Sequence, residues 1–307
     1  FVLETRNVSE HFPNKEKFGL FFYERENKYR KKTADGRANS CLPFFVSDAF
    51  RYFFFFVFRR YLWGVTPNFF LNCLMYKELQ AMAYLADCLN LTDISIFFEK
   101  EAETLKTNIR KHCWDERDRF YYSVDLNLLP VEKPDIEGLY SGDLYLHVGQ
   151  PRTYDCLIQR FSVWSGFMAM WAQVATPEQA RQMVQIHFCD TTSFNAPAGI
   201  RTLSPLEKMY NVRASGNPSS WAGPIWINVN YLVFRGLLQY GYEKEARDVA
   251  EKTILLLGRD FERFGALHEY YLPDNGEPVL NRGFQNWNFL VLNMIAWMEG
   301  RPVVTEF

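Results

Sequence analysis

The chain has 307 residues, of which 48% are hydrophobic and 23% are charged, a balance typical of a folded globular protein. The formal net charge of −2 gives no electrostatic reason to expect nucleic acid or an anionic membrane as a partner. One domain is favoured over two, because no linker rich in Gly, Ser or Pro divides the chain. Since the chain opens with Phe rather than Met, we expect this single domain, 1–307, to lack part of a longer chain at its N-terminus.

The composition contains little that points to a metal, a cofactor or a membrane. The cysteines show no Cys-x-x-Cys pair, so we interpret them as buried free thiols, which favours a reducing compartment. No signal peptide opens the chain, and the expected location is the cytoplasm or the periplasm. The most apolar run, 42–64, is interrupted by charged residues, whereas a membrane span needs about 20 largely uncharged ones. No phosphate-binding loop is present either. Taken together, these features lead us to expect no cofactor, no metal and no membrane span.

From residue 71 onward the apolar pattern predicts helices that come in pairs. In each pair the second helix is amphipathic, with one buried stripe, while the first is apolar nearly all round. Alternating buried and half-buried helices suggest an inner ring wrapped by an outer one. The predicted helices are 72–90 with 93–113, 154–174 with 176–188, 223–241 with 243–264, and a last helix 286–300.

This pairing predicts an all-α fold, the (α/α)6 toroid, with short extended segments at 119–126 and 266–272 over one mouth. The helix-end signals agree. Thr176 and Pro177 predict a helix start, and Gly241 predicts a helix end. The long irregular segment 189–226 is the clearest loop, and a loop of this length inside a compact domain is usually functional.

Two stretches in the C-terminal half carry a resemblance to a known family. They are "NPSSWAGPIWINVNYLVFRGLLQYGYEKEARDVAEK" and "GALHEYYLPDNGEPVLNRGFQNWNF". Together they resemble the catalytic domain of glycoside hydrolase family 63, which is related to trehalases and glucoamylase-like enzymes of the same toroid fold. The resemblance covers residues 71–300. It implies hydrolysis of an α-linked glycoside with inversion at the anomeric carbon.

An inverting hydrolase needs two carboxyl groups about 6.5–9.5 Å apart, one as general acid and one as general base. By its place in the family's motif, Glu269 matches the general base. The alternative is that Glu269 caps a backbone or pairs with Arg263 or Arg282. The general acid is less well defined. Asp48 is the first candidate and Asp35 the second, although the family's motif around Asp48 is incomplete and a purely structural Asp is a third interpretation.

A small carbohydrate is the expected substrate, bound by aromatic rings and amides near Glu269. Trp221 has a better claim on the pocket than Trp226, for which a core role fits equally well. If 266–272 is extended, only one of Tyr270 and Tyr271 faces the site. The candidate substrate-binding residues are Trp221, Trp226, Asn217, Asn228, Asn230, Tyr270, Trp287 and Arg213.

Two other functions stay open. A sugar epimerase on the same barrel works through histidines, and His187 and His268 are the ones in the C-terminal half. His268 is expected to point opposite to Glu269 and to be structural. A non-catalytic sugar-binding relative is the other alternative, because the motif around the candidate acid is damaged. The oligomeric state is not indicated.

Overall fold

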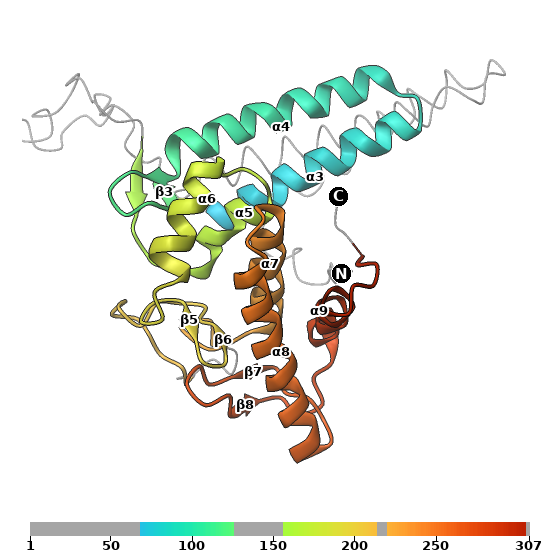
Figure 1. The fold of residues 1–307 in the computed structure, drawn as a ribbon. Coiled ribbons are helices and arrows are strands. Elements are labelled where there is room, and N and C mark those ends of the chain that lie inside the picture. Colours follow the sequence, from blue (N-terminus) through green and yellow to red (C-terminus); the bar gives the residue numbers. More distant parts are fainter. Residues whose placement is uncertain (1–67, 126–155, 214–219, 305–307) are drawn as a thin grey trace, which may run out of the picture. The chain divides into compact units, whose positions relative to one another are not determined.

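The computed structural model describes residues 68–125, 156–213 and 220–304, all within one compact unit, Phe58–Phe307. Its α-helices are α3 (Phe69–Cys88), α4 (Thr92–His112), α5 (Met168–Trp171), α6 (Pro177–Met183), α7 (Ile227–Gln239), α8 (Glu243–Phe264) and α9 (Val291–Met298) (Figure 1). Shorter helical turns are η3 (Trp164–Phe167), the π-helical η4 (Val184–Phe188) and η5 (Asn286–Leu290).

The strands are short and pair as antiparallel hairpins or ribbons of two. β1 pairs with β2, β3 with β4, β5 with β6, and β7 with β8. Their bounds are β1 (Trp114–Asp115), β2 (Phe120–Tyr121), β3 (Ser123–Asp125), β4 (Leu157–Gln159), β5 (Asn195–Ala196), β6 (Gly199–Ile200), β7 (Tyr270–Tyr271) and β8 (Pro278–Leu280). Both segments predicted to be extended, 119–126 and 266–272, therefore contain strands.

Helical hairpins are the main packing unit, as the sequence predicts. α3 packs against α4, α7 against α8, α5 against α7, and α8 against α9. The predicted contrast within a pair is clear in α7 and α8. α7 buries residues on all sides, namely Ile227, Val229, Asn230, Tyr231, Val233, Phe234, Arg235, Gly236 and Leu237. α8 buries a single stripe, namely Ala246, Val249, Ala250, Thr253, Leu256, Leu257 and Asp260.

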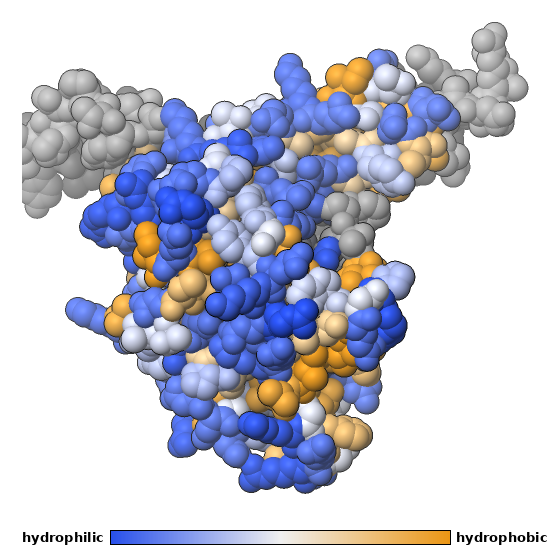
Figure 2. Space-filling view, viewed as in Figure 1, coloured by the Kyte–Doolittle hydropathy of each residue, from blue (hydrophilic) through white to orange (hydrophobic). Residues whose placement is uncertain are grey.

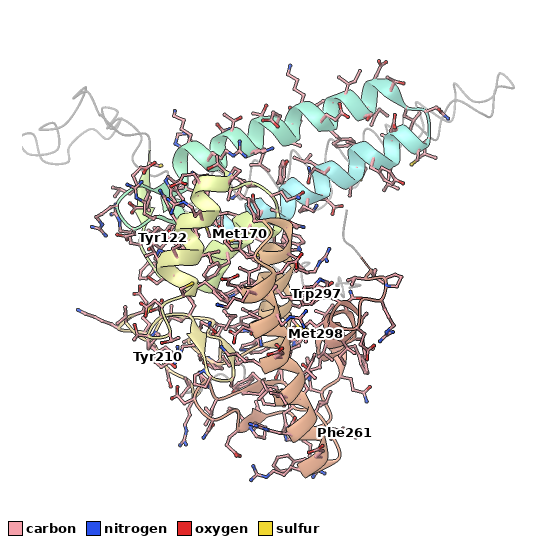
Figure 3. All side chains as sticks on the ribbon, viewed as in Figure 1. Tyr122, Met170, Tyr210, Phe261, Trp297 and Met298 are labelled. Carbon is pink, nitrogen blue, oxygen red and sulfur yellow. The ribbon has the colours of Figure 1, made fainter. Side chains whose placement is uncertain are left out.

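Helices α5 and α7 approach each other closely at Gly236. A Cβ atom there would lie 2.9 Å from the backbone nitrogen of Trp171 and 3.1 Å from the Cβ of Met170, which is labelled in Figure 3. Any larger residue would push the two helices apart, because a packed interior has no spare volume. The glycine thus sets the spacing of an inner helix against its neighbour.

The predicted helix 154–174 is wrong in its first half. Leu157–Gln159 form strand β4, which pairs with Ser123–Asp125, and α-helix begins only at Met168 after a 3₁₀ turn. A short apolar run does not distinguish a half-buried strand from a helix. The deciding contact is with a strand distant in the sequence, which local periodicity does not report.

Two other helices begin later than predicted. α7 starts at Ile227 rather than 223, because the residues before it are extended: Ile225 forms isolated bridges with both Arg201 and Tyr271. The last helix opens as the 3₁₀ turn Asn286–Leu290 before α9. These extended residues place the start of the inner helix α7 beside β7.

The predicted helix ends are confirmed. Thr176 forms a capping box with Gln179, in which Gln179 N donates to Thr176 Oγ1 at 3.2 Å and Thr176 N donates to Gln179 Oε1 at 2.8 Å. Pro177 is the first residue of α6. Gly241, with φ +78°, follows the end of α7 and donates its N–H to the carbonyl of Leu238.

The described surface is mixed in polarity. On the face drawn in Figure 2, hydrophobic residues form separate groups among hydrophilic ones. No helix in the described ranges is long and apolar enough to cross a bilayer. All cysteines of these ranges are free, but Cys88 and Cys189 are exposed, contrary to the expectation of buried thiols, whereas Cys73 and Cys113 are buried. Burial raises the pKa of the Cys113 thiol to about 12.

Candidate active site

Glu269 lies directly before strand β7, on the hairpin that β7 forms with β8. Its N–H donates to the carbonyl of Leu280 at 3.1 Å, and its residue is 7% exposed. One carboxylate oxygen, Oε2, accepts a hydrogen bond from Nδ2 of Asn281. Within the described ranges the other oxygen, Oε1, accepts no hydrogen bond. The carboxylate is therefore buried, held at one oxygen and unpartnered at the other.

The alternative ion pairs for Glu269 are not formed. Arg263 binds Glu277 through both carboxylate oxygens at 2.8 Å. Arg282 donates to the carbonyl of Phe264. Both arginines thus have other partners, and the interpretation of Glu269 as half of a salt bridge with either of them is wrong.

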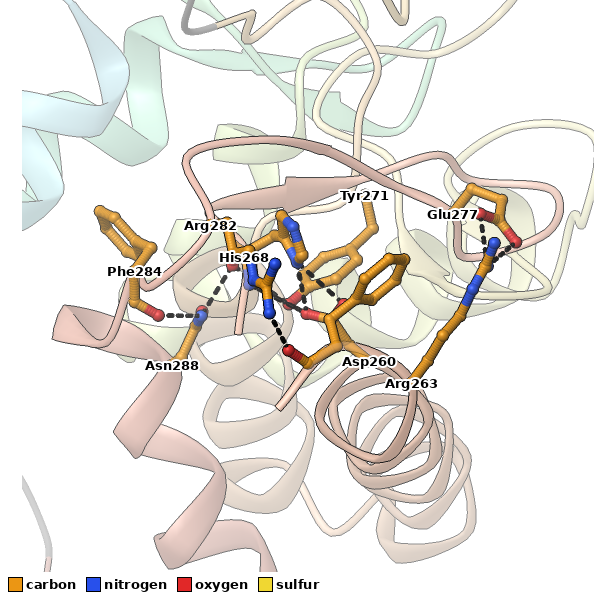
Figure 4. A network of polar contacts seen from close by, with 9 residues as sticks. Asp260, Arg263, His268, Tyr271, Glu277, Arg282, Phe284 and Asn288 are labelled. Atoms are coloured by element: carbon orange, nitrogen blue, oxygen red, sulfur yellow. Dashed lines mark hydrogen bonds and ion pairs between the residues drawn. The ribbon is translucent and has the colours of Figure 1, made fainter. Parts of the chain in front are cut away.

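A buried polar network holds the residues on either side of Glu269 (Figure 4). Asp260, from the last turn of α8, accepts hydrogen bonds from the backbone N–H of His268 at 2.9 Å and from the hydroxyl of Tyr271 at 2.8 Å. Nδ1 of the His268 ring lies 2.9 Å from Asp260 Oδ1. Asn288 donates to the carbonyl of His268 at 2.8 Å. A carboxylate that receives several donors is a strong anchor, so this network fixes the strand that carries Glu269.

Strict alternation along the strand is broken at this point. The ladder between β7 and β8 shifts register between Tyr270 and Tyr271. His268 and Tyr271 consequently both bond Asp260, whereas Tyr270 stacks on Trp226. A β-bulge changes the direction in which the following side chains point, and the sequence pattern does not reveal this change. His268 is therefore structural, as predicted. Tyr271 belongs to the network around Asp260, whereas Tyr270 belongs to the aromatic stack.

An aromatic stack begins at Tyr270, the residue that follows Glu269. The ring of Tyr270 stacks on Trp226 with centroids 5.2 Å apart, and Trp226 stacks on Trp221 at 4.0 Å. Trp226 is 1% exposed and donates Nε1 to the carbonyl of Ser220 at 2.8 Å, whereas Trp221 is 41% exposed. Trp226 is therefore the buried centre of the stack, and Trp221 presents its ring to solvent.

Two further features complete the surroundings of the stack. Trp287 lies beside Trp226 with centroids 5.7 Å apart, and its buried Nε1 has no partner within the described residues. Burial raises the pKa of the Tyr270 phenol, and the negative charge of Glu269 raises it further. Tyr270 is therefore a neutral phenol at neutral pH, so it brings no second negative charge to the carboxylate.

The described parts of the long segment, residues 189–213 and 220–226, are tied to the strands. Its β5–β6 hairpin and the bridge from Arg201 to Ile225 tie it to the β7 strand through Ile225. Gly223, in the Trp-Ala-Gly-Pro motif, has φ +136°, and a Cβ there would lie 2.4 Å from the ring of Tyr210. Only glycine fits this position, and its N–H donates to Thr202 Oγ1 at 2.9 Å. The backbone conformation at this position therefore requires the glycine of the motif, and Trp221 and Trp226 lie on either side of it in the sequence.

The remaining predicted residues are distributed differently. Asn230 is fully buried, and its amide bonds the N–H of Ile200 and the hydroxyl of Thr253, so in this conformation it is not exposed to a sugar. Asn228 is half-buried and accepts from the N–H of the next residue, Val229. Arg213 is exposed in the long loop. Asp48, Asp35 and Asn217 lie outside the described residues.

Two residues of the site region were not predicted, Asp260 and Asn281. Asp260 had a signal in the sequence: it continues the apolar stripe of α8, where Thr253 and Leu257 precede it, and a carboxylate on a buried stripe requires partners. Asn281 had a weaker one, since "LNRG" resembles a turn, and Asn is common where the backbone is left-handed.

Both histidines that an epimerase would use are engaged with the protein. His187 lies on η4, its Nε2 is 2.7 Å from the carbonyl oxygen of Asp118, and its ring packs on Phe120 at 4.4 Å between centroids. Burial lowers the pKa of His187. His268 bonds Asp260. The geometry gives no support to a catalytic pair of histidines.

Comparison with known proteins gives a family and a fold. A model of the mannosylglycerate hydrolase MGH1-like glycoside hydrolase domain matches residues 64–288. The chain is 26% identical to a probable trehalase of Eremothecium gossypii over an alignment of 212 residues that covers 64% of this chain and 24% of that protein.

Solved structures agree on the fold. The GH63 mannosylglycerate hydrolase of Thermus thermophilus in complex with glucose has a TM-score of 0.54 and 19% identity, covering 79% of this chain and 53% of that one. The neutral trehalase of Saccharomyces cerevisiae has a TM-score of 0.54 and 18% identity, covering 76% and 38%. The predicted (α/α)6 toroid and the resemblance to glycoside hydrolase family 63 are confirmed. The chain spans about half the length of that hydrolase and about a quarter of the probable trehalase.

Proposed function

Because the chain belongs to the mannosylglycerate hydrolase MGH1-like glycoside hydrolase domain family, we propose that it hydrolyses a small α-linked glucoside or mannoside with inversion, using Glu269 as general base. One observation carries this proposal. Glu269 is a buried carboxylate with one oxygen hydrogen-bonded to Asn281 and the other unpartnered within the described residues, and the next residue, Tyr270, belongs to an aromatic stack. A purely structural buried carboxylate normally has both oxygens satisfied, as Asp260 does.

In the proposed reaction Glu269 removes a proton from a water molecule as that water attacks the anomeric carbon. The bond between the anomeric carbon and the glycosidic oxygen breaks, and a second carboxylic acid protonates the leaving oxygen. The attack from the face opposite to the leaving group converts an α-linkage into a β-sugar. Asp48 is the proposed general acid, with Asp35 as the alternative; both lie outside the described residues.

The aromatic stack supports a carbohydrate substrate. Trp221 presents an exposed ring that is braced from behind by Trp226, and a sugar ring binds well to such a flat apolar face. Trp287, whose buried indole N–H has no partner among the described residues, and Tyr270 are the proposed neighbours of the same substrate. Arg213 and Asn217 remain candidates from the loop, whereas the satisfied amide of Asn230 argues against a direct role for that residue.

We expect Trp221→Ala to raise KM about tenfold or more, with a smaller change in kcat. The stacked ring binds the sugar in the ground state and in the transition state alike, and aromatic contacts contribute roughly 0.5–1.5 kcal/mol beyond buried area. Steady-state kinetics measure the split. Tyr84→Ala, at an exposed aromatic on α3, is the matched control and is expected to leave KM unchanged. An unchanged KM in Trp221→Ala would remove this ring from the substrate surface.

The substrate is tested on a panel of trehalose, α-mannosylglycerate, α-glucosylglycerate and an α-glucosyl disaccharide that represents a glycan end. We expect release of glucose or mannose from at least one of them, measured enzymatically. Calorimetric binding of a panel sugar without turnover would support the non-catalytic sugar-binding relative instead. Neither binding nor turnover on the whole panel would contradict the proposal.

A further inference from the structure

The partner of Glu269, Asn281, has an unusual backbone. Its φ is +55°, in the left-handed region that residues with a side chain rarely adopt, and in which Asn is enriched among them. The residue is exposed, so burial does not force its amide to find a protein partner. Its amide nevertheless donates to Oε2 of the buried Glu269.

The turn that contains Asn281 is fixed to the irregular segment before Glu269. The N–H groups of Gly283 and Phe284 both donate to the carbonyl of Leu267, at 2.8 and 3.0 Å, and Phe284 N–H also donates to the carbonyl of Asn281 at 3.2 Å. On the other side, Glu269 N–H donates to the carbonyl of Leu280. The left-handed residue therefore lies between two anchored points, and its side chain is directed to the carboxylate.

We propose that Asn281 is a positioning residue that holds Oε2 of Glu269 and thereby directs Oε1 towards the attacking water. This inference rests on the proposed function and names a residue that the sequence pattern did not. A glutamate has three side-chain torsions, so a single hydrogen bond at one oxygen restricts where the other can lie. The nearby cations do not compete for this task, since Arg263 binds Glu277 and Arg282 binds a carbonyl.

Two substitutions separate positioning from a purely structural role. Asn281→Gly removes the amide and adopts a left-handed backbone without strain, so its folding is expected to be unimpaired. Asn281→Asp keeps the shape and the tolerance of this backbone but places a carboxylate against a carboxylate. Asn90→Gly is the matched control: Asn90 follows α3, is exposed and has φ +57°, but it is remote in sequence from the hairpin.

The experiment measures melting temperature, kcat and KM of the full chain on the panel substrate that the wild type hydrolyses. We expect kcat to fall about tenfold or more in Asn281→Gly, as for loss of a hydrogen bond to a charged group, with KM and melting temperature little changed. In Asn281→Asp the fall is larger, and the low-pH limb of kcat/KM moves to higher pH, because two adjacent carboxyl groups resist joint ionisation.

The outcomes are distinct. Wild-type kcat in Asn281→Gly would overturn the positioning role while leaving the proposed function in place. A lower melting temperature with unchanged kcat would show that the residue only shapes the turn, and would overturn it as well. A wild type that is inactive on every panel sugar would contradict the proposed function itself and this inference with it.

Discussion

Glu269→Gln is expected to abolish hydrolysis, with a fall in kcat of about 10³-fold or more, while the protein stays folded. A neutral amide cannot accept a proton from water, and general base catalysis together with its positioning contributes at least this much. The side chain keeps its size, and the amide oxygen of the glutamine can replace Oε2 of Glu269 as the acceptor for Asn281. Single-turnover and steady-state assays measure the loss, and circular dichroism checks the fold.

The control for this substitution lies on the same hairpin. Glu277→Gln removes a charge from an exposed pair with Arg263, and surface pairs contribute about 0–1 kcal/mol to stability. Its turnover is expected to match the wild type. Wild-type turnover in Glu269→Gln itself would show that another group is the base.

Asp260→Ala is expected to lower the free energy of unfolding by about 2–4 kcal/mol. It removes the acceptor for the backbone N–H and the ring of His268 and for the hydroxyl of Tyr271, all of them buried, and each unsatisfied donor costs about 1–3 kcal/mol. If the Tyr271 hydroxyl donates instead to the carbonyl of His268, 3.1 Å away, the decrease in the free energy of unfolding is expected at the lower end of this range. Urea unfolding measures the change.

Two companions make this result specific. Tyr271→Phe removes one donor to Asp260, which still accepts hydrogen bonds from His268. A smaller decrease in the free energy of unfolding, about 1 kcal/mol, is therefore expected. Glu251→Ala changes an exposed carboxylate on the same helix and is expected to stay within about 0.5 kcal/mol of the wild type. Equal stability of Asp260→Ala and Glu251→Ala would mean that the network does not anchor the hairpin.

The helical framework was predictable because its signals are local. The stripe of α8 and the capping box at Thr176 depend on residues three or four apart, and both are present as predicted. The strand at Leu157–Gln159 depends on pairing with Ser123–Asp125, across residues that no periodic pattern connects. The late start of α7 has the same origin, since Ile225 pairs with Arg201 and Tyr271.

The candidate site was predictable in its residue types but not in its geometry. The motif names Glu269 and the two tryptophans as candidates, because it records residue types at fixed spacing, and their roles stay a prediction. It did not reveal that Trp226 is buried beneath Trp221, or that the bulge at Tyr270 sends Tyr271 to Asp260. Asn230 shows the opposite error: an amide on a helix near the motif was interpreted as a sugar ligand, but it bonds Ile200 in the core. Such assignments depend on which neighbour satisfies a polar group, and that is decided by tertiary packing.

The most direct test of the account is the configuration of the first sugar released. A glycosylglycerate is the suitable substrate, because its glycerate carries no anomeric centre and every anomeric signal then comes from the transferred sugar. Proton NMR during the first minutes of hydrolysis, before mutarotation equilibrates the product, is expected to show the β-anomer, as an inverting reaction with Glu269 as base requires. The α-anomer as the first product would mean retention, and would contradict the role proposed for Glu269.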